Sequence, residues 1–323
     1  MSDVLWILGG LVLALHLLRE YWLRRNLPQV QTATFDGELY RVGQTYIARR
    51  PATTQSRKSI VCFPGFLEDM RYFQALYAGA DCELVLVNNA NYHCAYPTDN
   101  ARELDWPDNP HPPGSIEHDA FYLGLILREL VTGTEIILHG HSRGGAVVLE
   151  TGHQYPDLVR GADRQVAAIL EAPVLPGART VGRGSEPIPF RLICYFMPLV
   201  LGLSRRLPPE KLLDQPMMRP SNDLKLAVCS AIYTNPRNYS TCIANVRSIR
   251  NWQRAQAYDR YANYERITVV IGERDDVLDN PSMLASAARG RALNDGVAIL
   301  QTEGTNHFPS LEKPAYLTEL ARV

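Results

Sequence analysis

The segment Gly140-His141-Ser142-Arg143-Gly144 has the spacing of a serine nucleophile held in a sharp turn. It follows the apolar run at residues 134–138 and leads into a helical pattern. Glycine has no Cβ, so glycines at these positions let a strand turn abruptly into a helix with the serine hydroxyl projecting from the turn. A glycine-rich turn whose serine only caps the helix is the alternative. The strand–turn–helix context favours Ser142 as a nucleophile.

A serine hydroxyl is a weak nucleophile until a base accepts its proton, and the base needs a carboxylate that fixes its tautomer. Two histidines follow Ser142 in the chain, His153 and His307. His153 falls about three turns along the helix that begins at the serine, on a side that points away from it. His307 follows the strand-like run at residues 297–301 and is therefore the candidate base.

With its motif and this later histidine, the chain resembles the α/β-hydrolase superfamily, whose catalytic residues run Ser, then Asp or Glu, then His. The resemblance covers residues 35–323 and implies a triad of Ser142, Asp275 and His307. Asp275 takes the family's G-x-x-D position after the apolar run at 267–271. Asp276, one residue further on, and Glu171, which closes the run at 166–170, remain alternatives for the acid.

The resemblance also implies an oxyanion hole made of two backbone N–H groups. Arg143, directly after the nucleophile, would supply one. Phe66 would supply the other, because Pro64-Gly65-Phe66 stands where the family often has His-Gly. Serine at the nucleophile position argues against the dehalogenase and epoxide hydrolase branches, which use aspartate there. The resemblance implies no metal and no organic cofactor.

Short apolar runs alternate with helical patterns through the body of the chain. Such runs, apolar on consecutive positions, are typical of parallel strands buried on both faces. The order predicts an α/β fold, with a mostly parallel central sheet flanked by helices. A hairpin is expected at residues 39–48 and a helix at 116–131, whereas the proline-rich stretch at 88–115 predicts a long irregular loop. Strands are expected at residues 59–63, 83–87, 134–138, 166–170, 267–271 and 297–301.

Residues 176–264 interrupt this alternation and are too long for one crossover helix. We expect them to form a helical cap inserted into a catalytic core of residues 35–175 and 265–323. The segment from Ile188 to Leu203 is strongly apolar, but Arg191 and Pro198 argue against a second membrane span. This segment is therefore the suspected substrate-binding part of the cap.

Residues 1–25 contain fifteen consecutive uncharged positions, from Val4 to Leu18. These cover roughly 22 Å, and extension to Leu23 approaches the ~30 Å of a bilayer core. We expect an uncleaved, single-pass membrane helix, with a signal peptide or an interfacial helix as alternatives. Arginines follow the apolar run, which favours the cytosolic face for the main domain, although the extracytoplasmic face is possible.

Composition excludes several classes of protein. Apolar residues make up 46% and charged residues 21% of the 323 positions, which excludes a disordered chain. The net charge of −1 gives no basic field for nucleic acid. The six cysteines form no CxxC pair and no zinc-type cluster, which indicates buried free thiols. No feature predicts an oligomeric state.

Together these patterns predict a membrane-anchored serine hydrolase that cleaves carboxylic esters of lipid-like substrates. Its partners would be a lipid-like acyl ester and the lipid bilayer. An acyl thioesterase or an acyltransferase would use the same triad and is the alternative. A non-catalytic scaffold with a hydrolase fold is a third possibility, which an intact triad argues against.

Overall fold

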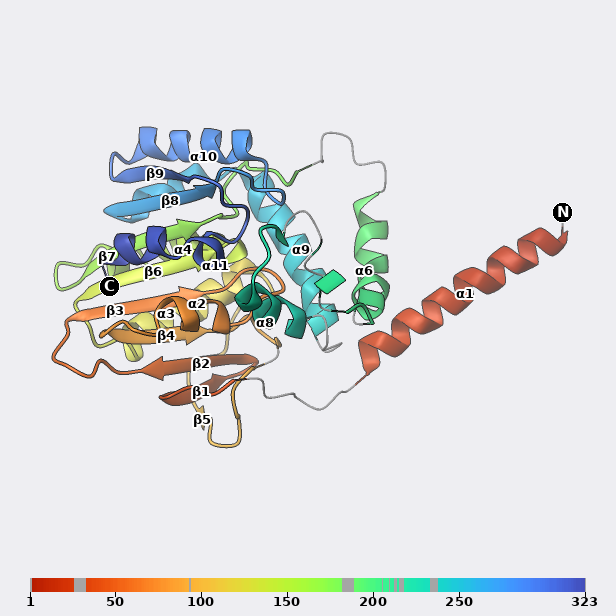
Figure 1. Cartoon of the computed structure of the whole chain (residues 1–323), viewed down its shortest axis with the longest axis horizontal. Coiled ribbons are helices and arrows are strands. Elements are labelled where there is room, and N and C mark those ends of the chain that lie inside the picture. Colours follow the sequence, from red (N-terminus) through yellow and green to blue (C-terminus); the bar gives the residue numbers. More distant parts are fainter. Residues whose placement is uncertain are drawn as a thin grey trace.

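A computed structural model describes residues 2–25, 33–92, 94–181, 189–204, 206–208, 210–211, 214, 218–232 and 238–322. Its centre is a nine-stranded sheet with the order β5-β1-β2-β4-β3-β6-β7-β8-β9 (Figure 1). The strands are β1 Glu38–Val42, β2 Thr45–Arg50, β3 Lys58–Phe63, β4 Glu83–Val87, β5 Arg102–Glu103, β6 Glu135–His141, β7 Gln165–Glu171, β8 Arg266–Gly272 and β9 Val297–Thr302.

In the order of the sheet, the six strands β4, β3, β6, β7, β8 and β9 are parallel to one another. Strand β2 pairs antiparallel with β1 and with β4. This confirms the predicted α/β class, the mostly parallel sheet and the opening hairpin. The prediction of a wholly irregular loop at residues 88–115 is wrong at β5, whose two residues pair in parallel with β1. Two residues are too short a run for hydrophobic periodicity to reveal.

Helices cover both faces of the sheet because the inner strands are apolar on both. In β3, Ile60 and Cys62 face one layer of helices, and Val61 and Phe63 face the other. The first layer contains α2 (Arg71–Leu76), α11 (Pro309–Glu312) and α12 (Ala315–Ala321). The second contains α3 (Ile116–Glu129), α4 (Arg143–Gln154), α5 (Pro156–Val159), the 3₁₀ helix η2 (Tyr258–Asn263) and α10 (Asn280–Leu293).

The chain between β7 and β8 forms further helices at one end of the sheet: α6 (Phe190–Ser204), α8 (Asp223–Ile232) and α9 (Asn238–Ala255). Figure 1 shows this group between the sheet and the N-terminal helix. Parallel strands end in their carboxyl termini at a common edge, so helices inserted there lie over that edge. Ile188, the expected start of the apolar segment, lies outside the described residues, and α6 begins at Phe190.

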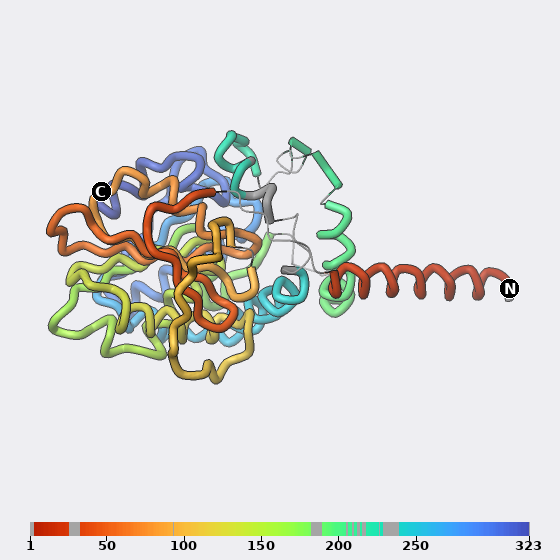
Figure 2. The backbone as a smooth tube through the Cα atoms, turned by 90° about the horizontal axis from the view of Figure 1, so that it is seen from below, coloured from red at the N-terminus to blue at the C-terminus, as the bar shows by residue number. Residues whose placement is uncertain are grey.

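The N-terminal helix α1 (Ser2–Arg24) projects away from the body, as Figure 2 shows. By length and composition, the segment Asp3–Arg24 of this helix could cross a membrane. Its last turns pack against α6, where Trp22 is only 4% exposed. A Cβ on Gly202 of α6 would lie 2.8 Å from the Trp22 ring, so the two helices touch closely.

Candidate active site

Ser142 lies in the turn between β6 and α4 with φ 50° and ψ −114°, in the left-handed region that side chains rarely adopt. A Cβ on Gly144 would come within 2.0 Å of the Phe63 carbonyl oxygen, so β3 and the start of α4 meet at a position that only glycine fits. The Ser142 N–H donates to the Glu171 carbonyl at 2.8 Å. The turn therefore has one tightly fixed conformation.

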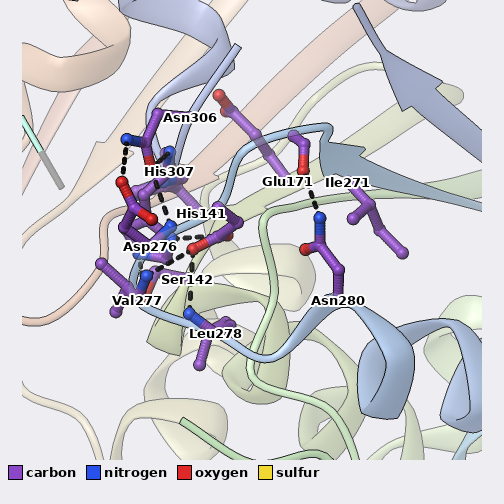
Figure 3. A network of polar contacts seen from close by, with 12 residues as sticks. His141, Ser142, Glu171, Ile271, Asp276, Val277, Leu278, Asn280, Asn306 and His307 are labelled. Atoms are coloured by element: carbon purple, nitrogen blue, oxygen red, sulfur yellow. Dashed lines mark hydrogen bonds and ion pairs between the residues drawn. The ribbon is translucent and has the colours of Figure 1, made fainter. Parts of the chain in front are cut away.

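The structure brings Ser142, His307 and Asp275 together at the carboxyl edge of the sheet. His307 Nε2 lies 3.1 Å from Ser142 Oγ, and His307 Nδ1 lies 2.9 Å from Asp275 Oδ2. Figure 3 shows Ser142 and His307 from separate loops of the sheet edge in this network. The three residues are between 3% and 7% exposed, so their interactions are little weakened by water.

Asp275 is held by the turn that carries it. Its Oδ1 accepts the N–H groups of Val277 and Leu278 at 2.8 and 2.9 Å, which leaves Oδ2 for His307. Burial would raise the pKa of Asp275, but attraction to His307 and the hydrogen bonds outweigh it and lower the pKa. The carboxylate therefore stays ionised and accepts from Nδ1–H, which leaves Nε2 free to accept the serine proton.

Asp276 and Glu171, the other candidates for the acid, bind elsewhere. Asp276 is exposed and pairs with the side chain of Asn306 at 2.9 and 3.1 Å. Glu171 is fully buried and accepts from the Tyr72 hydroxyl at 2.9 Å and from Ser310 Oγ at 2.7 Å. Burial opposes ionisation of Glu171, yet its hydrogen bond to His139 and the nearby histidine charges lower its pKa to about 2. Each carboxylate fixes the segment around His307 without touching its imidazole.

The expected oxyanion donors, the N–H groups of Phe66 and Arg143, belong to two segments next to Ser142. In the described part of the chain, the N–H groups of Phe66 and Arg143 donate to no other protein atom. A Cβ on Gly65 would lie 2.8 Å from the Ser142 Cβ, so the loop after β3 approaches the serine closely. Asn89 Nδ2 donates to the Gly65 carbonyl at 2.9 Å and fixes this loop.

The side chain of Arg143 has a role that the sequence did not predict. It is fully buried, and its guanidinium donates to Asn89 Oδ1 at 2.6 Å and to the Ser115 carbonyl at 2.9 Å. It also forms an ion pair with Asp119 at 2.6 Å. One cation thus joins the serine turn to the end of β4, to the loop after β3 through Asn89, and to the first turn of α3.

His141 and Glu68 form a second pair that sequence reasoning missed. His141 Nδ1 lies 2.7 Å from Glu68 Oε2, and its Nε2 lies 2.7 Å from the His307 carbonyl oxygen. Both ring nitrogens face acceptors, so both donate and the ring is cationic. Burial would lower the pKa of His141, but Glu68 more than offsets this and raises it to about 9. The available signal was a titratable residue directly before the serine.

Helix α8 of the inserted group is joined to the loop that carries His307. Lys225 is fully buried, and its ammonium pairs with Glu312 Oε1 of α11. Glu312 Oε2 accepts the backbone N–H of Asn306 at 2.6 Å. A continuous polar connection therefore runs from the inserted helices to the residue before His307.

A cavity of about 320 Å³ opens beside Ser142 and His307. Most of its wall is apolar, and α9 supplies four of the lining residues, Val246, Ile249, Arg250 and Gln253. No described residue of α6, the suspected substrate-binding segment, lines it. Helix α6 reaches the cavity indirectly, because Phe190 lies against the Arg250 guanidinium, 4.1 Å from ring centre to Cζ. The remaining lining residues are Phe66, Leu67, Glu68, Ser142, Val174, Thr180, Met218, Val277, Leu278, His307 and Phe308.

Across the described ranges, no cluster of three or more His, Cys, Asp or Glu side chains is placed to hold a metal ion. Five cysteines are buried free thiols: Cys62, Cys82, Cys94, Cys194 and Cys242. The side chain of Cys229 lies outside the described part.

The sequence profile described as "Alpha/beta hydrolase family" matches residues 60–320, and the chain belongs to that family. A search of curated proteins finds no match. Among solved structures, a putative lipase from Acinetobacter baumannii AYE is 12% identical with a TM-score of 0.61, and the match covers 96% of this chain and 93% of that one.

Two further structures share the fold. MenH from S. aureus is 16% identical with a TM-score of 0.58, and the match covers 85% of this chain and 96% of that one. A thermophilic esterase from Thermogutta terrifontis is 16% identical with a TM-score of 0.57, with 92% and 97% covered. At such identities the likeness establishes the fold, and the chemistry has to be argued from this chain's own site.

We expect a fluorophosphonate probe to label the native protein at Ser142, because His307 is placed to accept the serine proton. Ser142→Ala should abolish labelling and lower turnover by several orders of magnitude. The probe adduct is measured by peptide mass spectrometry. Ser240→Ala, the same change on the exposed side of α9, is the matched control and should label normally. An adduct on another serine would refute the assignment.

Asp275→Asn should lower kcat by about 10⁴-fold, because an amide can hold the imidazole in the wrong tautomer. Asp276→Asn should have a small effect, because Asp276 contacts Asn306 and not the imidazole. Steady-state kinetics on one ester compare the two variants. Equal or reversed losses would show that Asp275 is not the acid.

The His141–Glu68 pair should make stability depend on pH. In the folded protein the pKa of His141 is about 9, above its ordinary value of 6.5. The pair's contribution to the free energy of unfolding is therefore complete below pH 6.5 and is lost as the pH rises through 9. At about 1.4 kcal/mol per pK unit, this shift stabilises the folded protein by up to about 3 kcal/mol. Urea unfolding between pH 6 and 10 should show this decline, and Glu68→Gln should flatten it. Glu135→Gln, an exposed position on β6, should leave the wild-type slope.

Proposed function

We propose that this α/β hydrolase is a membrane-anchored serine hydrolase that cleaves carboxylic esters of lipid-like substrates through an acyl-enzyme on Ser142. The observation that carries the proposal is the hydrogen-bonded series from Ser142 Oγ through His307 to Asp275, at the wall of a largely apolar cavity. A serine placed in this way has an adjacent base, and the base has a carboxylate that orients it.

In the proposed reaction, His307 Nε2 accepts the Ser142 hydroxyl proton as Oγ attacks the ester carbonyl carbon. The carbonyl oxygen becomes an oxyanion, which the N–H groups of Phe66 and Arg143 stabilise. The imidazolium then protonates the leaving alkoxide, and the C–O bond breaks to give the acyl-enzyme. Water, deprotonated by His307, attacks the acyl carbon, and the proton returns to Ser142 as the acid is released.

The cavity supports an ester with a long apolar part and at least one further polar group. Apolar side chains from the core, such as Val174 and Leu278, and from α9 form much of its wall. In addition, Gln253 Nε2 and Thr180 Oγ1 are buried and have no hydrogen-bond partner among the described residues. Leaving such groups unpaired is costly, so a substrate oxygen that accepts from them would bind favourably there.

Contacts at the end of α1 favour an uncleaved anchor over a signal peptide. Trp22 packs in a cluster with Leu199 and Leu201 of α6, and Arg19 donates to the Tyr195 carbonyl at 3.0 Å. Cleavage after α1 would remove Trp22 and expose this apolar cluster to water, which costs free energy. Arg19, Arg24 and Arg25 at this end favour a cytosolic catalytic domain.

A thioesterase or acyltransferase remains the second candidate, because the same serine, histidine and donors would serve it. A non-catalytic scaffold does not explain why a buried aspartate, histidine and serine are aligned at hydrogen-bonding distances.

Substrate profiling tests the proposal. Purified full-length protein is incubated with matched oxygen esters and thioesters of increasing acyl length and with phospholipids, and products are measured by mass spectrometry. We expect hydrolysis of oxygen esters that Ser142→Ala abolishes and that improves with acyl length, because the cavity is apolar. Preference for thioesters, or transfer to an acceptor other than water, would favour the alternative. Turnover retained in Ser142→Ala would refute a serine hydrolase.

A further inference from the structure

Helix α6 carries an exposed apolar stripe that no described part of the chain covers. Leu192, Phe196, Val200 and Leu203 are 45%, 38%, 58% and 56% exposed, and their spacing of four, four and three residues places them on one face. Leu207, just beyond the helix, is 43% exposed and continues the series. The opposite face, with Cys194, Pro198 and Leu201, is buried. We call the five exposed residues the α6 stripe.

Exposed arginines lie at both ends of the α6 stripe. Arg191 precedes Leu192, and Arg206 precedes Leu207. An amphipathic helix with a bulky apolar face and terminal basic residues is typical of helices that lie in the plane of a membrane surface. Long basic side chains there can reach anionic head groups while the apolar face is immersed.

Helix α6 is attached to one defined part of α1, its last turns. His16 Nδ1 lies 2.8 Å from the Tyr195 hydroxyl, and Trp22 packs on Gly202. Figures 1 and 2 both show α1 leading away from the body past α6. Since α1 meets α6 over its final turns, the depth at which α1 sits in a bilayer also sets the depth of α6.

The length of α1 then decides that depth. The uncharged run Val4–Leu18 covers roughly 22 Å, about 8 Å less than a hydrocarbon core of ~30 Å. The remaining length comes from residues up to Leu23, the part of α1 that α6 flanks. A bilayer spanned by α1 must therefore reach α6, whose stripe leaves leucine, valine and phenylalanine side chains exposed.

We propose that α6 is an in-plane membrane helix whose stripe is immersed in the leaflet that adjoins the catalytic domain. This rests on the proposed function in one respect, namely that α1 spans the bilayer. The occupant of the stripe is lipid, because α6 packs directly against the proposed membrane helix α1 and exposed arginines lie at both ends of the stripe. A second copy of the chain on the stripe is the competing occupant.

Immersion of α6 would bring the active site to the membrane. Leu199 and Leu201 lie in one apolar cluster with Tyr92, and Phe66 and Leu67 of the oxyanion loop pack against that cluster. At the other end of α6, Phe190 covers Arg250 in the cavity wall. The substrate's apolar part would then pass from the leaflet into the cavity beside α6 without crossing water.

Depth-dependent quenching tests this placement. Full-length protein with a fluorophore on Val200→Cys or Leu203→Cys is reconstituted in phosphatidylcholine–phosphatidylglycerol vesicles that contain spin-labelled lipids. Val12→Cys on α1 is the control for the bilayer interior, and His153→Cys, exposed on α4, is the control for water. Chain without an added cysteine gives the labelling background. We expect quenching of the stripe labels by shallow spin labels, of Val12 by deep ones, and of His153 by neither.

The outcomes separate this proposal from the proposed function. Quenching at Val12 with stripe labels that behave like His153 would overturn the in-plane helix and leave the anchor standing. No quenching at Val12 would remove the anchor and the inference together, while Ser142-dependent hydrolysis of soluble esters would still stand. Close approach between stripe labels of two copies, measured by spin–spin distances, would show that a second copy covers the stripe and overturn lipid immersion.

A functional measurement uses matched leucines. Leu203→Glu should lower hydrolysis of esters embedded in vesicles several-fold and leave hydrolysis of a short soluble ester unchanged, because a charge in the stripe opposes immersion. Leu293→Glu on α10, where the leucine is equally exposed at 56%, should change neither activity. Equal effects of the two variants on the vesicle substrate would contradict the proposal.

Discussion

The close crossing between β3 and the turn at Ser142 is the constraint on which the active site depends. Gly144 lies so near the Phe63 carbonyl that no side chain fits, and Ser142 has a left-handed φ of 50° as a result of the abrupt change from β6 to α4. This geometry presents the serine hydroxyl at the sheet edge and brings the loop after β3 alongside it. The base, the acid and the backbone donors are all placed relative to that one turn.

Buried charged groups hold the surrounding loops in place relative to the turn at Ser142. Arg143 with Asp119, His141 with Glu68, and Glu171 with its hydroxyl and imidazole donors are all almost completely removed from water. Burying a charge is expensive unless a partner satisfies it, so displacement of any of these loops would leave an unpaired ion in a low dielectric. The cost of that displacement gives the site a single arrangement.

Much of the fold could be predicted because it rests on local patterns. The apolar runs predicted six strands to within a few residues. The G-x-S-x-G motif and the later of two downstream histidines pointed to Ser142 and His307, which the structure places within hydrogen-bonding distance. The Glu68–His141 pair and the side-chain contacts of Arg143 could not be predicted, because they join residues distant in sequence whose meeting depends on strand order. Asp275 and Asp276 are adjacent and chemically identical, and only the direction of the turn after β8 distinguishes them.

The ion pair between Lys225 and Glu312 has a consequence for labelling chemistry. Lysine amines are the usual targets of acylating reagents, and this chain has only four, Lys58, Lys211, Lys225 and Lys313. Lys225 is fully buried between α8 and α11, so a reagent can modify it only when those helices separate. The rate at which Lys225 becomes acylated, compared with that of exposed Lys313, would thus report how often the inserted helices lift from the loop that carries His307.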